Sequence, residues 1–236
     1  QREFQTIMSA IASSLQAVRE RIARAARDFG RSPREISLLA VSKTWPVDCV
    51  IEANRAGQWS FGENYVQEGV AKVLATAGWG LEWHFIGPLQ SNKTRLVAEH
   101  FSWVHAIERL KVAERLSAQR PDDLPPLSVC IEVNVSGAAT KSGCTPDEAL
   151  ALCQAVSGLP RLKLRGLMAI PEAADDFAAQ RVPFRQLREL REKIRAAGLP
   201  LDTLSMGMSH DLEAAVAEGA TIVRIGTAIF GERGYA

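Results

Sequence analysis

The sequence has little of several features that would assign it to a particular class of protein. Its formal net charge is only +1, with 28 Lys and Arg against 27 Asp and Glu, so we expect no nucleic-acid partner. No apolar run approaches the roughly 20 residues that a membrane helix requires, so we expect no membrane partner either. The first residues, Gln1-Arg2-Glu3, do not form a signal peptide, and the missing initial methionine indicates that the sequence starts inside the native chain.

Cysteine is also scarce. The four cysteines show no C-x-x-C pair and no histidine at metal-binding spacing; they are Cys49, Cys130, Cys144 and Cys153. This pattern predicts no structural metal and is typical of small buried residues in a reducing compartment. We therefore expect a cytoplasmic protein.

The sequence does contain a regular alternation of short apolar runs and helix-like segments. An initial helix is expected over 4–29, where Gly30 ends it, and eight strand–helix units follow. The proline-rich stretch 121–126 is no domain boundary, because the alternation resumes directly after it. The expected strands cover 38–43, 59–61, 83–86, 103–107, 127–135, 162–170, 203–206 and 221–225.

Such alternation requires a parallel sheet. Eight units in about 200 residues is the number found in a (β/α)8 TIM barrel, at the short end of its usual size. We therefore expect one domain over 1–236, an α/β barrel with an extra N-terminal helix, and rank a doubly wound open sheet second.

One lysine, Lys43, ends the first apolar run, and Pro46 is well placed to begin a helix. Lys43 is therefore expected at the carboxyl end of a parallel strand, the edge where α/β folds place their chemistry. An apolar strand behind the amine favours its neutral, nucleophilic form. The alternative is a lysine that simply extends into solvent.

An arginine, Arg224, interrupts the last strand, which is otherwise apolar. An unpaired buried charge costs several kcal/mol, so the guanidinium requires a partner. That partner is either a strand carboxylate such as Glu132, in a structural ion pair, or a heteroatom of a ligand.

Two loops rich in glycine and hydroxyl groups follow the seventh and eighth strands, where barrels of this kind often bind phosphate. They read 205–209, ending on Ser209, and Gly226-Thr227-Ala228. Glycine lets backbone N–H groups approach an anion, although Ser209 and Thr227 are equally suited to be helix N-caps. A lysine, an arginine and a phosphate site together fit pyridoxal 5′-phosphate (PLP), whereas a sugar phosphate accounts less well for the arginine.

Several longer motifs carry a resemblance to a known family. From about Leu38 onward the chain resembles the pyridoxal phosphate homeostasis proteins, stand-alone relatives of the alanine racemase N-terminal barrel. The segments that carry it are AVSK at 40–43, FGENY at 61–65, HFIGPLQSNK at 84–93, RGLM at 165–168, SMGMS at 205–209 and VRIGTAIFG at 223–231.

The resemblance implies a (β/α)8 barrel in which Lys43 forms a Schiff base with PLP. It implies that Arg224 faces the pyridine nitrogen and that the phosphate is held by Ser209, Gly226 and Thr227.

Four further positions have alternative roles. Asn64 is expected to contact the cofactor ring or its 3′-oxygen, and Met168 either packs against the ring or belongs to the barrel core. His84 is either a ligand contact or a hydrogen-bonded core histidine. Lys141, in the long loop after the fifth strand, is either a second basic contact or a solvated lysine.

An arginine opposite the pyridine nitrogen keeps its own proton, so the ring becomes a weak electron sink. This disfavours transamination and permits racemisation, which needs a second acid–base group across the substrate. The resembling racemases supply it as a tyrosine from a C-terminal domain. This sequence ends at Ala236, and its two tyrosines are Tyr65 and Tyr235.

We therefore expect a non-enzymatic role in vitamin B6 homeostasis, in which the protein holds PLP and passes it transiently to PLP-dependent apo-enzymes. A monomer is expected, because the domain that completes the racemase dimer is missing from the sequence. The alternatives are a single-domain amino-acid racemase using Lys43 and Tyr65 or a water, and a sugar-phosphate aldolase with a Schiff-base lysine.

Overall fold

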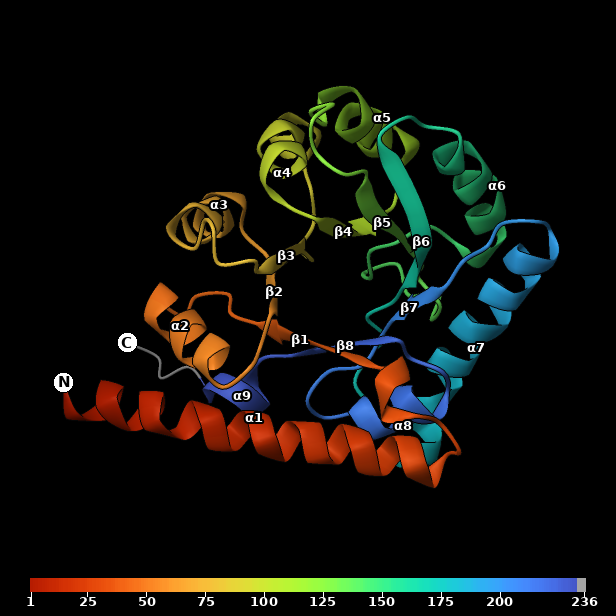
Figure 1. The fold of residues 1–236 in the computed structure, drawn as a ribbon. Helices are drawn as coiled ribbons and strands as arrows, with labels where there is room; N and C mark the ends of the chain where they lie inside the picture. The colour runs from red at the N-terminus through yellow and green to blue at the C-terminus, as the bar shows by residue number, and fades with distance from the viewer. Residues whose placement is uncertain (233–236) are drawn as a thin grey trace.

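The structure, a computed structural model, is a closed barrel of eight parallel strands (Figure 1). It describes residues 1–232, with backbone only at positions 4 and 7–9. The strands follow one another around the barrel in chain order, and β1 (Ser37–Val41) pairs with β8 (Ile222–Ile225) to close it. The expected (β/α)8 architecture is confirmed, and the open doubly wound sheet is wrong.

The remaining elements alternate as the sequence predicts. The other strands are β2 (Ser60–Glu63), β3 (Glu82–Phe85), β4 (Trp103–Ile107), β5 (Leu127–Glu132), β6 (Leu162–Met168) and β7 (Thr203–Ser205). The helices are α1 (Arg2–Asp28), α2 (Val47–Arg55), α3 (Val66–Ala75), α4 (Thr94–His100), α5 (Leu110–Gln119), α6 (Pro146–Ser157), α7 (Phe177–Ala196), α8 (Leu212–Ala217) and α9 (Thr227–Phe230), with 3-10 turns at Pro33–Glu35 and Ser91–Lys93.

The two faces of the strands form two separate layers of side chains, because successive strand residues point to opposite sides. The inward layer is a small cluster that fills the barrel: Leu39, Val41, Ile86, Trp103, Ala106, Cys130, Met168 and Ile222. The outward residues form a larger core against the surrounding helices. All four cysteines are buried, as the sequence predicts.

The additional helix α1 lies outside the ring and packs across α2, α8 and α9, along the lower edge of Figure 1. Its arginines attach it to the barrel: Arg21 pairs with Glu213 at 2.7 Å, and Arg19 donates to the Ala56 carbonyl at 3.0 Å. No helix in the described part of the chain is long and apolar enough to cross a membrane.

Several strand ends differ from the prediction, and β1, expected to end on Lys43, ends at Val41. β2 continues to Glu63, because Glu63 is in register with Phe85 on β3. β5 ends at Glu132, three residues early, because the chain then forms a bridge between Val133 and Cys144 that closes the following loop. The short helix α9 begins at Thr227, in the segment where the sequence offered Thr227 as a candidate helix N-cap.

Candidate functional site

The carboxyl ends of the strands collect the predicted site residues at one mouth of the barrel. Lys43 lies two residues after β1, Asn64 directly after β2, and Gly226 directly after β8. β1 pairs with both β2 and β8, so these three residues follow neighbouring strands. Gly226 lies so close to β1 that a Cβ there would be 3.3 Å from the Val41 carbonyl oxygen.

The backbone after Lys43 has an unusual conformation. Thr44 adopts φ +64°, the left-handed region that β-branched residues avoid. Such a residue costs about 1–3 kcal/mol and persists only where its surroundings hold it. The Thr44 N–H donates to Glu68 Oε1, so a carboxylate of α3 holds the turn in place.

Behind this turn lies a buried charged network that sequence reasoning missed. Lys72 Nζ lies 2.6 Å from Glu63 Oε1, 3.0 Å from Glu68 Oε1 and 2.8 Å from the Ser42 carbonyl oxygen. The Ser42 hydroxyl also donates to Glu63 Oε1, at 2.7 Å. Burial raises the pKa of Glu63, while Lys72 and the Ser42 hydrogen bond oppose that rise. The signal in the sequence was the i, i+4 pair of Glu68 and Lys72 beside a carboxylate in an apolar strand.

Arg224 lies inside the barrel, 5% exposed and in register with Leu39 of β1. Its Nη1 donates to Ser205 Oγ at 2.7 Å, and its Nη2 donates to the Ala169 carbonyl oxygen at 3.1 Å. Burial lowers the pKa of this guanidinium to about 10, which leaves it protonated at neutral pH. A guanidinium has five N–H donors, so two hydrogen bonds leave donors available to a ligand.

The alternative of an ion pair between Arg224 and Glu132 is not what the structure shows. Within residues 1–232 no carboxylate lies within 4.0 Å of the Arg224 guanidinium. Burial raises the pKa of Glu132 to about 7, the nearby Glu108 adds to that rise, and Arg224 opposes it.

The loops after β7 and β8 are joined by one hydrogen bond, in which the Ala228 N–H donates to Ser209 Oγ at 3.3 Å. Gly226, and not Thr227, is the N-cap residue of α9, so Thr227 is not a helix cap. Ser209 is held from outside the barrel as well, because Arg21 of α1 donates to its carbonyl oxygen at 2.9 Å. The Ser209 side chain thus connects the two loops.

Asn64 carries a direct sign of an absent partner. Its Oδ1 atom is buried and accepts no hydrogen bond from any described residue. Leaving such an atom unsatisfied costs about 1–3 kcal/mol. The loop after β3 packs tightly beside it, since a Cβ on Gly87 would be 2.4 Å from the Asn64 carbonyl oxygen. The backbone of Asn64 is therefore closely packed, and its side-chain oxygen can accept a hydrogen bond from a ligand.

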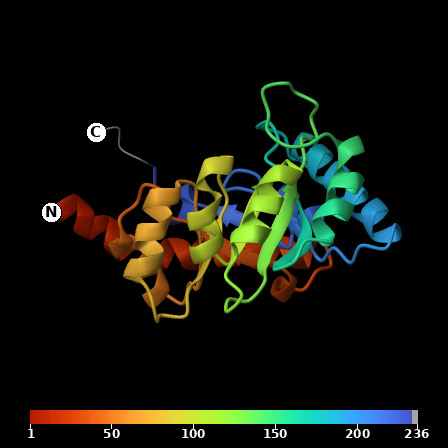
Figure 2. The same cartoon turned by 90° about the horizontal axis from the view of Figure 1, so that it is seen from above.

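The remaining candidates lie in different surroundings. Met168 is fully buried in the barrel-filling cluster, as its alternative role in the core predicts. Lys141 is half-buried in the loop between β5 and α6, which projects from the body of the molecule in Figure 2. Tyr65 is 54% exposed just after β2, and Tyr235 lies outside the described residues.

His84 is a hydrogen-bonded core histidine, as one of its two interpretations predicts. Its Nδ1 lies 2.8 Å from His105 Nε2, and its Nε2 lies 2.7 Å from Glu82 Oε1. His105 continues inward to Ser205 Oγ, at 2.8 Å. The sequence offered no signal that these histidines connect to Arg224.

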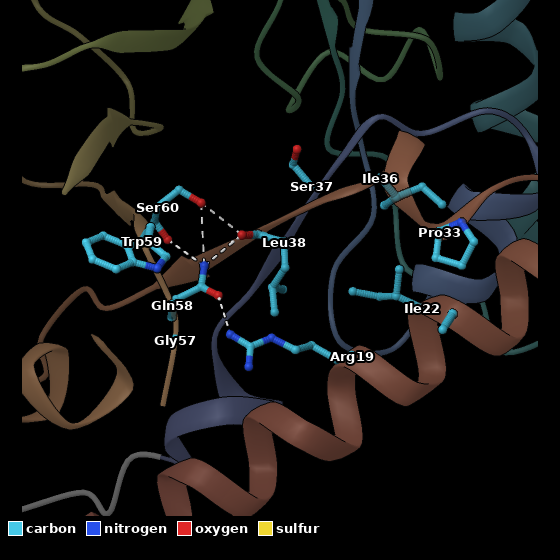
Figure 3. A pocket seen from close by; sticks show the side chains of 11 residues that line it. Arg19, Ile22, Pro33, Ile36, Ser37, Leu38, Gly57, Gln58, Trp59 and Ser60 are labelled. Atoms are coloured by element: carbon cyan, nitrogen blue, oxygen red, sulfur yellow. Dashed lines mark hydrogen bonds between the residues drawn. The ribbon is translucent and has the colours of Figure 1, made fainter. Parts of the chain in front are cut away.

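A separate hollow of about 460 Å³ lies at the opposite ends of β1 and β2, beside α1 (Figure 3). Its lining includes Arg19, Leu38 and Gln58, and the Gln58 side chain donates to the Leu38 carbonyl oxygen at 2.7 Å. None of the predicted site residues lines it, so it is distinct from the candidate site.

Comparison with known proteins agrees with this geometry. The family described as alanine racemase, N-terminal domain, matches residues 13–234. Alanine racemase from Corynebacterium glutamicum superimposes with a TM-score of 0.73 at 17% identity, over 96% of this chain and 62% of that chain. Fold and site together therefore define a barrel of the alanine racemase N-terminal class.

Relatives of higher identity narrow the assignment. The "Pyridoxal phosphate homeostasis protein" of Pseudomonas aeruginosa is 59% identical over 228 residues, which cover 97% of this chain and 98% of the relative. The protein of the same name from Escherichia coli K12 is 54% identical over 97% of this chain and 99% of its own. The chain belongs to the pyridoxal phosphate homeostasis protein family.

Solved structures include two further similar proteins. PipY of Synechococcus elongatus PCC7942, solved with PLP bound, has a TM-score of 0.82 and 36% identity, over 94% of this chain and all of that one. An unknown protein from Bifidobacterium adolescentis has a TM-score of 0.88 and 34% identity, over 95% of this chain and 96% of that one. The resemblance noted in the sequence is thereby confirmed.

Proposed function

We propose that this protein binds PLP at the mouth of the barrel and acts in intracellular PLP homeostasis, holding the cofactor and supplying it. The observation that carries this function is the buried Asn64 Oδ1, which accepts no hydrogen bond from any residue that the structure describes. Asn64 directly follows β2, the neighbour of β1, and Lys43 follows β1. The solved PLP complex of PipY supports the proposal, since PipY shares the fold at 36% identity.

Each site residue would contact a different part of the cofactor. Lys43 would hold its aldehyde carbon as a Schiff base, and Arg224 would donate a hydrogen bond to the pyridine nitrogen. The other contacts would come from Asn64 at the ring, Met168 behind it, and Ser209, Gly226 and Thr227 at the phosphate.

The chemistry of Arg224 favours a carrier over a catalyst. A guanidinium with a pKa of about 10 keeps its proton at neutral pH, so the pyridine nitrogen it faces stays unprotonated. PLP supplies an aldehyde and an electron-withdrawing ring, and an unprotonated ring nitrogen weakens that withdrawal. No observation on the described residues favours the racemase alternative, since Tyr65 is exposed.

The test is the visible absorption of the purified protein before and after borohydride, followed by peptide mapping. We expect a yellow protein, bleached by borohydride, with the pyridoxyl group on Lys43 and no such label in Lys43→Ala. A protein that stays colourless after PLP is added contradicts the proposal and favours a sugar-phosphate ligand. Slow exchange of solvent deuterium into the α-position of added amino acids separates a carrier from a racemase, which exchanges fast.

The remaining expectations belong to the same proposal. We propose that residues 1–236 act as one domain and as a monomer in the cytoplasm, and that PLP passes transiently to apo-enzymes. The buried cysteines are consistent with a reducing compartment. Sedimentation would report the oligomeric state, and reactivation of a PLP-dependent apo-enzyme by the loaded protein would report transfer.

A further inference from the structure

A continuous hydrogen-bonded chain crosses the inside of the barrel and ends on Arg224. It begins at Glu82, the first residue of β3, whose side chain is 53% exposed at the amino end of the strands. It then passes through His84 of β3, His105 of β4 and Ser205 of β7. The contacts are 2.7 Å for Glu82–His84, 2.8 Å for His84–His105, 2.8 Å for His105–Ser205 and 2.7 Å for Ser205–Arg224.

The direction of every hydrogen bond in this chain follows from its two ends. The hydrogen bond from His84 lowers the pKa of Glu82, so at neutral pH this carboxylate only accepts. His84 Nε2 must therefore carry a hydrogen. Burial lowers the pKa of both histidines, so each imidazole is neutral and has one N–H only.

The remaining tautomers are then determined. Because His84 uses its hydrogen at Nε2, its Nδ1 accepts, and His105 Nε2 must donate to it. His105 Nδ1 is left as an acceptor, so the Ser205 hydroxyl donates to it. Ser205 Oγ in turn accepts from Arg224. All four hydrogen bonds point the same way, from the guanidinium toward the carboxylate.

The surroundings keep the middle of this chain dry and uncharged. The His84 ring stacks on Trp103, with centroids 5.0 Å apart and planes 7° apart. The guanidinium carbon of Arg165 lies over the Trp103 ring, 4.5 Å from the ring centroid. The charged groups that face the two histidines are Glu82 and Arg165 at one end and Arg224 at the other, and both cations oppose protonation of the imidazoles.

We propose that Glu82, His84, His105 and Ser205 are positioning residues that fix the orientation and the charge of Arg224 from the opposite end of the barrel. A chain polarised in one direction strengthens each of its bonds, and the low dielectric of the interior enhances the effect. Glu82 thereby acts on the candidate site through Arg224, without contacting a ligand itself. The consequence for bound PLP rests on the proposed function, whereas the chain itself is a property of the ligand-free protein.

The first experiment reads the tautomers directly, by ¹⁵N NMR of the imidazoles in ligand-free protein. The sequence has four histidines, and the other two, His100 and His210, serve as internal references. We expect His84 and His105 to be neutral and protonated on Nε2 at neutral and mildly alkaline pH, since burial lowers the pKa of both. Protonation of either residue on Nδ1 in the wild-type protein overturns the assigned direction.

The decisive variant is Glu82→Gln, which removes the charge at an exposed side chain and so preserves the fold. An amide can donate as well as accept, so the requirement on His84 Nε2 disappears and the reversed chain becomes available. We expect a fraction of His105 to shift to the Nδ1–H form, because His105 is linked to Glu82 through His84. The matched control is Glu99→Gln, which removes a charge from the same face. Among the described residues Glu99 forms an ion pair with Arg95 alone, at 3.9 Å.

The second experiment uses PLP and separates the two proposals. We expect Glu82→Gln to weaken PLP binding about three- to tenfold and to shift the pH midpoint of the bound-cofactor spectrum, with Glu99→Gln unchanged. If Glu82→Gln shifts the His105 tautomer but leaves the spectrum of bound PLP unchanged, the proposal that Glu82 influences the site is overturned. Failure of wild-type protein to bind PLP overturns the proposed function, while the NMR result on the chain still stands.

Discussion

Two buried polar networks support the two basic residues of this site, and they are built on opposite principles. The one behind Lys43 uses full charges, with Lys72 between Glu63 and Glu68. The one behind Arg224 uses two neutral imidazoles and a hydroxyl, with its charges only at the ends. The first is compact, because opposite charges must neutralise each other where they are buried. The second extends through the barrel, because neutral groups cross a low-dielectric interior without a large desolvation cost.

The difference also appears along the chain. Lys72 reaches its carboxylate partners nine and four residues away, within β2 and α3. The bond from His105 to Ser205 joins residues 100 apart, and the one from Ser205 to Arg224 joins residues 19 apart. The ion pairs of the charged network are therefore local in sequence, although Ser42 joins it from 30 residues before Lys72. The neutral chain exists only once the barrel is closed. The two networks should respond differently when a single group is removed.

The largest effect is expected from Lys72→Met. Without the ammonium group, Glu63 remains buried with no counter-charge, and breaking a buried pair in this way costs about 3–5 kcal/mol. Urea unfolding of the ligand-free protein measures the loss. Because protonated Glu63 needs no counter-charge, we expect the loss to be smaller at acidic pH than at pH 8.

The matched control for this variant is Lys111→Met, at an exposed helix position, which should change the stability little. The double variant Glu63→Gln with Lys72→Met should recover part of the loss. Equal losses for Lys72→Met and Lys111→Met would contradict the role of Lys72 in the charged network.

Glu132 sharpens the comparison, because it is a buried carboxylate in neither network. Its folded-state pKa of about 7 lies above its ordinary value of 4.5, so the folded protein binds the proton more tightly. The stabilisation is complete below about pH 4.5 and is lost as the pH rises through 7. This difference corresponds to about 3 kcal/mol.

We expect Glu132→Gln to flatten the stability–pH curve over that window, measured by urea unfolding at several pH values. Glu189→Gln, at an exposed position of α7, is the control and should leave the curve unchanged. If Glu132→Gln gives the same stability–pH curve as the wild-type protein, the pKa of Glu132 is not elevated.

A smaller effect is expected from Ser205→Ala in the neutral chain. It removes the acceptor of Arg224 and the donor to His105 together, and leaving such groups unsatisfied costs about 1–3 kcal/mol. Ser128→Ala is a matched control, since Ser128 is also buried but accepts only a long hydrogen bond from Arg165, at 3.4 Å. Thermal unfolding compares the two, and equal losses would show that the neutral chain has no special weight in stability.

Much of the architecture was predictable, because it depends on short-range patterns. Apolar runs of strand length, each followed by a helix, predicted eight units and hence a parallel barrel. A short-range capping motif also marks the start of α6, where the Thr145 side chain accepts a hydrogen bond from the Glu148 N–H. The ends of β5 and β6 were predicted too late, because the loops that follow them begin with residues as apolar as those of the strands.

The site likewise contains some residues that could be located from the sequence and some features that could not. Lys43, Asn64 and Gly226 could be located from the sequence, because each follows a strand and parallel strands place their carboxyl ends at one mouth. The left-handed conformation of Thr44 and its hydrogen bond to Glu68 could not be predicted, because a β-branched residue carries no local signal for that conformation.

The sequence by itself determined the order of strands and helices, the mouth at which Lys43 lies, and the family to which the motifs belong. Only the tertiary structure decided which buried groups become partners. Glu82, His84, His105, Ser205 and Arg224 carry no shared pattern along the chain, and their alignment depends on the register of four strands in a closed barrel. Hydrogen bonds require distances and angles within narrow limits, and such geometry is set by packing.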